Sequence, residues 1–220
     1  MKTPVLFNWS TGKDSSISLY ELLQDKRYDV AALLTTITRE YKRVSMHGVQ
    51  EELVLRQAES FEIPLEIVYI PRNATNEEYD NAMRKVLLGY REEGVFSVAS
   101  GDIYLEEVRQ YRVEKLASVG MDALFPVWGR ESKEIAHEFI DLGFKAIVTC
   151  VDTEMLSEEF SGKEFDKDFL KDLPEEVDPC GENGEFHTFC YDGPIFKQPV
   201  HITKGDVVLR NERYMFCDIY

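Results

Sequence analysis

A polar segment near the N-terminus, residues 10–16 with the sequence Ser-Thr-Gly-Lys-Asp-Ser-Ser, does most to constrain the fold of this chain. It separates two apolar stretches of different periodicity. Residues 4–8 are mostly apolar, and such a run ended by small polar residues is typical of a buried strand and a turn. In residues 17–23 the apolar side chains recur at the spacing of an amphipathic helix. The sequence therefore predicts a strand, a turn and a helix in succession.

The predicted turn is suited to binding an anion. The first N–H groups of a helix have no partner within the helix and lie at the positive end of its dipole, so a phosphate placed there accepts several hydrogen bonds. Gly12 allows the backbone to approach closely and tolerates a positive φ. Lys13 adds a positive charge, and the hydroxyl groups of the segment add donors. The alternative interpretation is an ordinary helix N-cap formed by Ser and Asp side chains.

The length and charge of the chain limit its classes of function. At 220 residues, one domain or one and a half is expected, and a net charge of −16 argues against nonspecific binding to nucleic acid. No apolar stretch is long enough to span a bilayer, and no signal peptide is recognisable. The cysteines lack the spacing of a zinc site, so a cytoplasmic protein with reduced thiols is expected. They are Cys150, Cys180, Cys190 and Cys217.

Strands and helices are predicted to alternate from the N-terminus to residue 151. Near-continuous apolar strands separated by amphipathic helices are typical of a parallel sheet with helices on both faces. We expect about five strands in this α/β sheet, with residues 145–151 as its last strand. The last forty residues alternate in polarity around a turn at residues 210–212, which predicts a small antiparallel piece within a C-terminal α+β segment. The predicted domains are residues 1–151 and 152–220.

Three polar segments follow predicted strands, at residues 10–16, 47–48 and 101–103. In an open parallel sheet, ligands bind outside the carboxyl ends of the strands. Asp102 is a candidate for holding a magnesium ion or a polar part of the substrate, with a helix N-cap as the alternative. Arg109 and Arg112 lie three residues apart on the helix predicted after Asp102, so both are expected to reach one anion. The alternative for the two arginines is a pair of surface salt bridges with neighbouring glutamates.

Residues 180–188, with the sequence Cys-Gly-Glu-Asn-Gly-Glu-Phe-His-Thr, are dense in functional groups. If a strand begins at Gly184, then Glu185 and His187 lie on one face of it, because side chains alternate along a strand. Such a pair could orient an amine or accept its proton. The alternatives are a structural turn and a metal site, although the pairing of a structural zinc site is missing.

The motifs together resemble the diphthine–ammonia ligase family, a branch of the N-type ATP pyrophosphatases, over nearly the whole chain. The segment 10–15 resembles the PP-loop of those enzymes, written Ser-Gly-Gly-x-Asp-Ser, and is not a Walker A loop because Asp14 follows Lys13. The other matching segments are Met-His-Gly at 46–48, Gly-Asp-Ile at 101–103, residues 109–114, Phe-Pro-Val-Trp-Gly at 125–129 and residues 180–188. The chain departs from the PP-loop pattern at Thr11, which makes the turn less permissive. It also departs from the family pattern at Asn183 and His187, which leaves the acceptor open.

The resemblance implies a Rossmann-like, adenine nucleotide α-hydrolase-like fold. It also implies an enzyme that adenylates a carboxylate with ATP, releases pyrophosphate and then lets ammonia displace AMP. Binding of ATP is then expected at Ser10, Thr11, Gly12, Lys13, Asp14, Ser15, Ser16, His47 and Gly101. The expected catalytic residues are Asp14, Asp102, Glu185 and His187, with Mg²⁺ near Asp14 or Asp102. The expected substrate-binding residues are Arg109, Arg112, Glu182 and Asn183.

The expected partners are ATP, ammonia and a carboxylate-bearing acceptor, such as the modified histidine of an elongation factor, without nucleic acid or membrane. A homodimer is the usual expectation for a small cytosolic enzyme. One rival interpretation is a nucleotide sensor that uses the same loop without turnover. Another is a PP-loop sulfur transferase acting on RNA. That enzyme would need a positive surface and paired cysteines, which the charge of −16 and the scattered cysteines disfavour.

Overall fold

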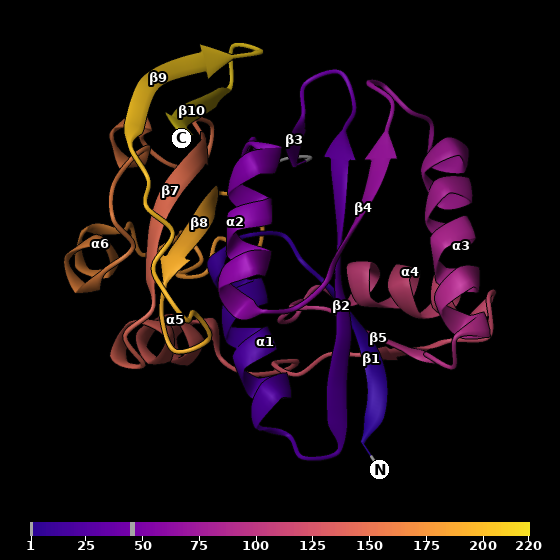
Figure 1. The fold of residues 1–220 in the computed structure, drawn as a ribbon. Helices are drawn as coiled ribbons and strands as arrows, with labels where there is room; N and C mark the ends of the chain where they lie inside the picture. The colour runs from indigo at the N-terminus through magenta and orange to yellow at the C-terminus, as the bar shows by residue number, and fades with distance from the viewer. Residues whose placement is uncertain (1, 45–46) are drawn as a thin grey trace.

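Two β-sheets organise residues 2–44 and 47–220, which are the residues that the computed structural model describes (Figure 1). The first sheet has the order β3-β2-β1-β5-β6, and β4 also pairs with β2. All pairings in it are parallel except that of β2 with β3. Its strands are β1 (Thr3–Asn8), β2 (Tyr28–Thr38), β3 (Arg43–Val44), β4 (Leu65–Ile70), β5 (Ser97–Ala99) and β6 (Asp122–Leu124). The prediction of a parallel α/β sheet is confirmed.

Helices cover both faces of this sheet, as predicted. Helices α1 (Lys13–Gln24) and α2 (Glu51–Phe61) lie on one face, and α3 (Asn76–Glu92) and α4 (Glu106–Ala117) lie on the other (Figure 1). Because side chains alternate along a strand, neighbouring residues enter different cores. Phe7 and Leu33 belong to the core on the side of α1, whereas Leu6 and Leu34 belong to the core on the side of α3.

The strand order places a switch point at β1. This strand pairs with β2 on one side and with β5 on the other, and both pairings are parallel. The chain first builds the sheet from β1 through β2 to β4, and then crosses back to add β5 and β6. At such a reversal the connections leave the sheet in opposite directions and open a crevice at the carboxyl ends of the strands. The segments after β1 and β5 both lie at this crevice.

The second sheet is antiparallel and has the order β8-β7-β10-β9. It contains β7 (Lys145–Asp152), β8 (Phe186–Asp192), β9 (Lys204–Arg210) and β10 (Tyr214–Ile219), accompanied by α5 (Ser132–Asp141), a 3₁₀ turn (Glu158–Phe160) and α6 (Lys167–Asp172). The antiparallel C-terminal piece is therefore confirmed. The assignment of residues 145–151 to the parallel sheet was wrong. A central strand that is covered on both faces is apolar throughout in either kind of sheet. The apolar pattern of residues 145–151 therefore could not show to which of the two sheets the strand belongs.

The two sheets are joined through the buried side chain of Gln57 on α2. Its Oε1 accepts a hydrogen bond from Trp9 Nε1 at 2.8 Å. Its Nε2 donates to the carbonyl oxygens of Thr11 and Cys190 at 3.1 and 2.6 Å. The N–H of Cys190 in β8 also donates to the carbonyl of Thr11 at 2.9 Å. The loop after β1 is thereby held against the second sheet by fully buried hydrogen bonds.

Two further sequence expectations concern the environment of the chain. All four cysteines are free and buried, in agreement with reduced thiols. Across residues 2–44 and 47–220, none of the helices combines the length and the apolar character that a membrane span requires.

Replacing Gln57 by Leu tests the junction between the sheets. The substitution leaves the Trp9 indole N–H and the Cys190 carbonyl buried without these partners, so the free energy of unfolding should fall by about 3 kcal/mol. Gln110→Leu on the exposed face of α4 is the matched control and should change it by less than about 0.5 kcal/mol. Urea denaturation of both variants measures the difference. Equal stability of the two variants would contradict this role of Gln57.

Candidate active site

A cavity of about 590 Å³ lies at the switch point, where the segments after β1, β2 and β5 meet the loop before β8. The first sheet contributes the end of β1, the first turn of α1 and the residues after β5. The C-terminal half contributes Gly181, Glu182 and Gly184 from the loop before β8 and residues 186–188 from β8 itself. The cavity therefore needs both halves of the chain, as expected for a C-terminal segment that closes the site.

Ten of the predicted site residues line this cavity. They are Ser10, Lys13, Asp14, Ser15, His47, Gly101, Asp102, Arg112, Glu182 and His187. Six further predicted residues, all in the described part of the chain, lie outside the lining: Thr11, Gly12, Ser16, Arg109, Asn183 and Glu185. Met46 of the Met-His-Gly segment lies outside the described residues.

The loop after β1 takes its shape from Thr11 and Gly12 in different ways. Thr11 adopts the left-handed region with a φ of 75°, which is uncommon for a β-branched residue. Gly12 is extended, with a φ of −91° and a ψ of −179°, so it does not supply the positive φ. A side chain at Gly12 would, however, meet the carbonyl oxygen of Thr188 at 3.0 Å. The close approach expected at Gly12 is therefore present, and it is made to β8.

The first turn of α1 presents its N-terminus to the cavity. The N-cap residue is Gly12, so the N-cap alternative with a Ser or Asp side chain is not realised, although the N–H of Lys13 donates to Thr188 Oγ1 at 3.0 Å. The hydroxyls of Ser15 and Ser16 donate to the carbonyl of Gly12 at 2.9 and 2.8 Å, and Ser10 Oγ donates to Ser15 Oγ at 3.1 Å. These bonds hold the loop in place. A helix N-terminus at the switch point, with no capping side chain on its own N-cap residue, is the arrangement that binding of a phosphate requires.

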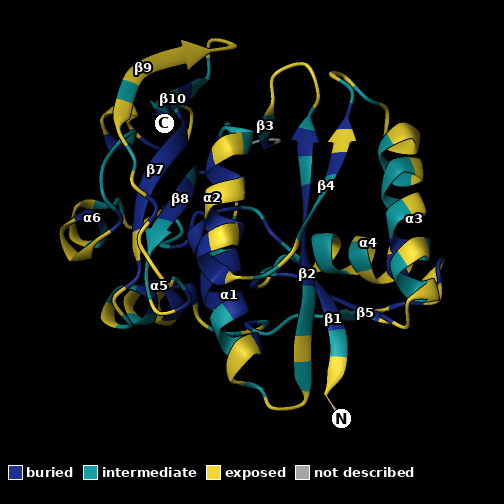
Figure 2. Cartoon of the chain, in the orientation of Figure 1, coloured by how far each residue is buried: buried dark blue, intermediate teal, exposed yellow. Residues whose placement is uncertain are grey.

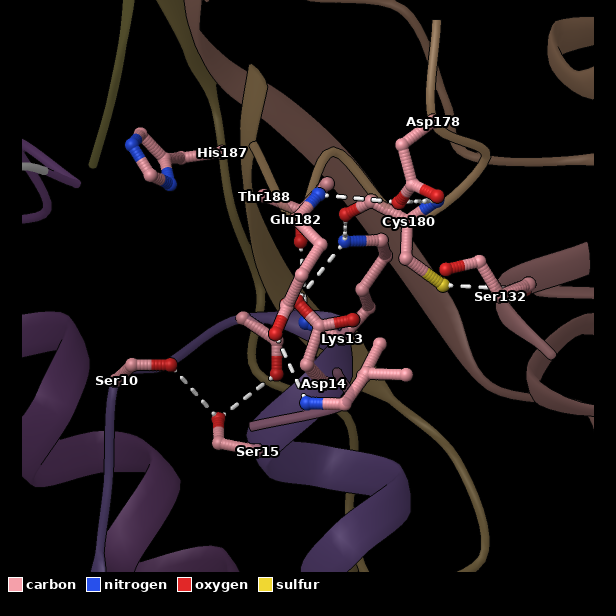
Figure 3. A network of polar contacts seen from close by, with 12 residues as sticks. Ser10, Lys13, Asp14, Ser15, Ser132, Asp178, Cys180, Glu182, His187 and Thr188 are labelled. Carbon is pink, nitrogen blue, oxygen red and sulfur yellow. Dashed lines mark hydrogen bonds and ion pairs between the residues drawn. The ribbon is translucent and has the colours of Figure 1, made fainter. Parts of the chain in front are cut away.

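Lys13 connects this helix to the loop before β8. Figure 3 shows its side chain reaching from α1 to the carbonyl oxygen of Cys180, to which Nζ donates a hydrogen bond. Nζ also lies 3.0 Å from Asp14 Oδ2 and 5.0 Å from the centre of the Phe186 ring. Burial is the largest influence and lowers the pKa of Lys13, but the negative charge and hydrogen bond of Asp14 together with the nearby Cys180 and Glu182 raise it, so that the net pKa is raised. Lys13 is therefore a buried cation that is already paired.

Asp14 keeps one oxygen free at the cavity. Its Oδ2 is paired with Lys13, whereas its Oδ1 is buried and has no hydrogen-bond partner. Burial raises the pKa of Asp14 and the adjacent ammonium group of Lys13 lowers it in part, so the net pKa is raised. A buried carboxylate oxygen without a partner costs free energy unless a ligand or ion satisfies it.

Glu182 links the loop after β5 to the loop before β8. Its Oε1 accepts a hydrogen bond from the backbone N–H of Ile103 at 2.8 Å (Figure 3). Burial, followed by the negative charge of Asp14, raises the pKa of Glu182 to about 7. The sequence indicated only a substrate contact at this position. The structure adds a carboxyl group that exchanges a proton near neutral pH.

His47 and His187 lie together at the cavity with their ring centroids 4.5 Å apart. Burial, and then the charge of Lys13, lowers the pKa of His187 to about 4. Burial and the neighbouring His187 likewise lower the pKa of His47 well below its usual value. Both rings are therefore neutral at pH 7. A base works best with a pKa near the working pH, and His187 does not meet this condition.

Arg109 and Arg112 diverge, so the expectation that both reach one anion was wrong. Arg112 lines the cavity and its Nε lies 2.7 Å from Asp102 Oδ2. Arg109 instead pairs with Glu106 at 3.1 Å, and its guanidinium lies 4.8 Å from the centre of the Trp128 ring. For Arg109 the alternative of a surface salt bridge with a neighbouring glutamate is therefore correct. Asp102 does not cap α4, because that helix begins at Glu106 with Leu105 as its N-cap residue.

Glu185 does not join His187 at the cavity. It precedes β8 and is buried, and its Oε1 accepts hydrogen bonds from the Asp178 N–H at 3.1 Å and from Asn183 Nδ2 at 2.9 Å. The expected shared face fails because β8 begins only at Phe186. Glu185 and Asn183 instead hold the shape of the loop that carries Glu182.

Several lining residues were missed by the sequence reasoning. Thr188 Oγ1 accepts a hydrogen bond from the backbone N–H of Lys13 at 3.0 Å. Thr35, at the crevice end of β2, is buried and its Oγ1 has no hydrogen-bond partner. A signal for Thr35 and Thr36 was available, because polar residues at the carboxyl end of an apolar strand mark the ligand edge of a parallel sheet.

The fold and the cavity define an α/β protein whose first loop and helix N-terminus lie at the switch point of its parallel sheet. The chain belongs to the diphthamide synthase family: residues 1–123 match its N-terminal domain and residues 131–219 match its C-terminal domain. The family resemblance drawn from the sequence is thereby confirmed. A domain boundary at residue 151 stays a prediction, and it would cut β7 just before its last residue.

Similar proteins carry the name diphthine–ammonia ligase. The one from Schizosaccharomyces pombe is 25% identical over 221 residues, which cover 90% of this chain and 36% of that protein. Those from Bos taurus and Homo sapiens are 28% and 26% identical, with 60% and 61% of this chain and 51% and 52% of theirs covered. The chain thus spans about half or less of these relatives. Among solved structures, the U34-tRNA thiolase NcsA from Methanococcus maripaludis is 18% identical, with a TM-score of 0.40 over 64% of this chain and 58% of that chain.

Gly101→Ala tests how closely the segment after β5 approaches α1. The new methyl group would lie 2.9 Å from the carbonyl oxygen of Asp14, so the first turn of α1 must shift. We expect at least a tenfold loss of ATP affinity by calorimetry and a loss of about 2 kcal/mol of stability. Gly89→Ala on α3, where a methyl group meets no atom within 4 Å, is the control and should retain ATP affinity. Unchanged ATP affinity in a folded Gly101→Ala variant would contradict ATP binding between α1 and the segment after β5.

Proposed function

We propose that this chain is an ATP-dependent ligase that adenylates a carboxylate and forms an amide with ammonia, with a diphthine-like group as the acceptor. The observation that carries the proposal is the N-terminus of α1, whose N-cap residue Gly12 has no capping side chain, at a cavity that also contains Asp14 and Glu182. The family match and the names of the relatives support the choice of reaction. The Rossmann-like strand order supports a nucleotide as the ligand.

The loop of residues 10–16 would bind the β- and γ-phosphates of ATP together. The helix N-terminus supplies N–H donors for these oxygens and leaves the α-phosphorus open toward the cavity. A carboxylate oxygen of the acceptor attacks the α-phosphorus, and the bond to the β-phosphate oxygen breaks to release pyrophosphate. Ammonia then attacks the acyl carbon of the adenylate, and AMP leaves with the electron pair of the broken C–O bond.

The residues present fit a magnesium ion bound together with ATP. Magnesium in nucleotide sites takes one or two protein carboxylates plus phosphate oxygens, and Asp14 Oδ1 is a carboxylate oxygen without a partner. Asp102 is less suited because its carboxylate is paired with Arg112. Among the described residues no cluster of three or more acidic, His or Cys side chains could hold a metal by itself. When bound, magnesium supplies neutralisation of the phosphate charge.

Glu182 is the proposed proton acceptor for ammonium. A carboxyl group with a pKa of about 7 accepts a proton from ammonium more readily than an imidazole with a pKa of about 4. His47 and His187, being neutral, would accept hydrogen bonds from ammonia and hold it beside Glu182. Arg112 is the proposed anchor for the acceptor carboxylate. Glu185 and Asn183 are proposed to position the Glu182 loop.

No observation favours sulfur transfer to RNA. A thiolate nucleophile needs a lowered pKa, whereas burial raises the pKa of Cys150 and Cys190 to about 12. Burial likewise raises the pKa of Cys180 well above its usual value. A nucleotide sensor remains the second candidate function. A sensor would bind ATP without converting it to products, whereas the ligase would convert it.

Product analysis with ATP labelled at the α-phosphate and, in a parallel reaction, at the γ-phosphate tests the reaction. With ammonia and an acceptor panel that includes diphthine-bearing elongation factor, AMP and pyrophosphate should appear in equal amounts. Asp14→Asn should reduce the rate at least a hundredfold, because it weakens the proposed metal ligand. Release of ADP and phosphate would refute the adenylation. Tight ATP binding with no turnover on any acceptor would favour the sensor.

The pH dependence of the reaction tests Glu182. Its carboxylate must be deprotonated to accept a proton, so kcat/KM for ammonia should fall about tenfold per pH unit below the pKa of about 7. Glu182→Gln should lower the rate by roughly a hundredfold and remove this inflection, while ATP still binds. His187→Gln is the comparison and should retain the inflection. A wild-type profile without it would rule out Glu182 as the base.

A further inference from the structure

The outer edge of the second sheet is formed by β9, which is unusually apolar for an exposed edge. Val207, Val208 and Leu209 in its centre leave 52%, 45% and 49% of their surface exposed. Within the described residues, β9 pairs only with β10 and its other edge pairs with no strand. Figure 2 shows β9 in the colour of exposed residues along most of its length, at the rim of the second sheet.

Such an edge favours association with another strand. Its unpaired N–H and C=O groups form a ready template, and natural proteins usually protect long edges with charges, prolines or bulges. In β9 three successive apolar residues occupy the centre, and the charges Asp206 and Arg210 stand on either side of them. Neither Asp206 nor Arg210 forms an ion pair within the described part of the chain. The edge therefore carries unpaired charges of both signs around an apolar centre.

We propose that β9 pairs antiparallel with β9 of a second copy of this chain, with a two-fold axis at Val208. In this register Asp206 of each copy lies opposite Arg210 of the other, and Val207 lies opposite Leu209. The Asp206–Arg210 charge pair forms twice because a two-fold interface repeats every contact. Arg210 is already held in place by its own chain, where its guanidinium lies 5.5 Å from the centre of the Phe216 ring.

The neighbouring two-fold registers are unfavourable. An axis at Val207 would place Lys204 opposite Arg210. An axis at Leu209 would remove the Asp206–Arg210 pairs, because Asp206 would then face the turn that follows β9. Like charges directly opposite each other destabilise a strand pair. Charge complementarity therefore selects the register centred on Val208. The dimer would join the two antiparallel sheets into one continuous sheet, away from the cavity. The inference goes beyond the proposed function and does not depend on it.

Sedimentation equilibrium of the full chain over a micromolar concentration series tests the pairing through charge reversal. The wild type should be dimeric, and Asp206→Arg and Arg210→Asp should each weaken the dimer at least about tenfold, because each places like charges opposite. The double variant D206R/R210D should restore it, since the opposite charges face each other again. A monomeric wild type, or a double variant that stays monomeric when both single variants are, would overturn the proposal.

Val208→Lys provides an independent test at the proposed axis, where it places two ammonium groups together. It should also shift the protein to monomer, whereas Leu55→Lys on the exposed side of α2 should leave the dimer intact. Thermal melting followed by circular dichroism shows whether each variant is folded, so that a loss of the dimer can be distinguished from unfolding. A dimer that persists in folded Val208→Lys and Asp206→Arg would place the interface elsewhere and overturn the proposal.

Discussion

The hydrogen bonds that the Thr11 carbonyl accepts from Gln57 and from the backbone of Cys190 are the contacts on which the site depends. A β-branched residue with a positive φ costs about 1–2 kcal/mol, and it persists only where its surroundings fix it. Here the second sheet fixes it, and the same sheet limits Gly12 to a residue without a side chain. The N-terminal loop therefore has its shape only in the presence of the C-terminal half.

The same dependence governs the charges of the cavity. The buried ammonium group of Lys13 is bonded to Asp14 beside it and to the Cys180 carbonyl of the other half. Because Lys13 is already paired, a polyphosphate would rely on the helix N-terminus and on a bound cation for neutralisation. The remaining negative charge of Asp14 is also one reason that the pKa of Glu182 is raised to about 7. The chain has a net charge of −16, and the closeness of the Asp14 and Glu182 carboxylates helps to give Glu182 the raised pKa that the proposed proton acceptor needs.

The sequence predicted what local patterns determine. The succession of strand, turn and helix was predicted correctly, because polarity and periodicity change sharply there, but α1 begins at Lys13 and not after residue 16. The partner of β7 was missed because any central strand is apolar throughout. The positions of Arg109 and Glu185 were missed because they depend on Trp128 and on Asp178, which come close only after folding. The raised pKa of Glu182 was likewise unpredictable, since it arises from burial between two loops distant in the sequence.

A crystal structure with α,β-methylene-ATP and magnesium would test the central claim most directly, because this analogue cannot be cleaved between the α- and β-phosphates. The account predicts the β- and γ-phosphates at the N-terminus of α1, between residues 10–16 and Gly101, with the α-phosphate on the side of Glu182. Thr11 should keep its positive φ and its bonds to Gln57 and Cys190. Phosphates bound elsewhere, such as between α3 and α4, would contradict the account.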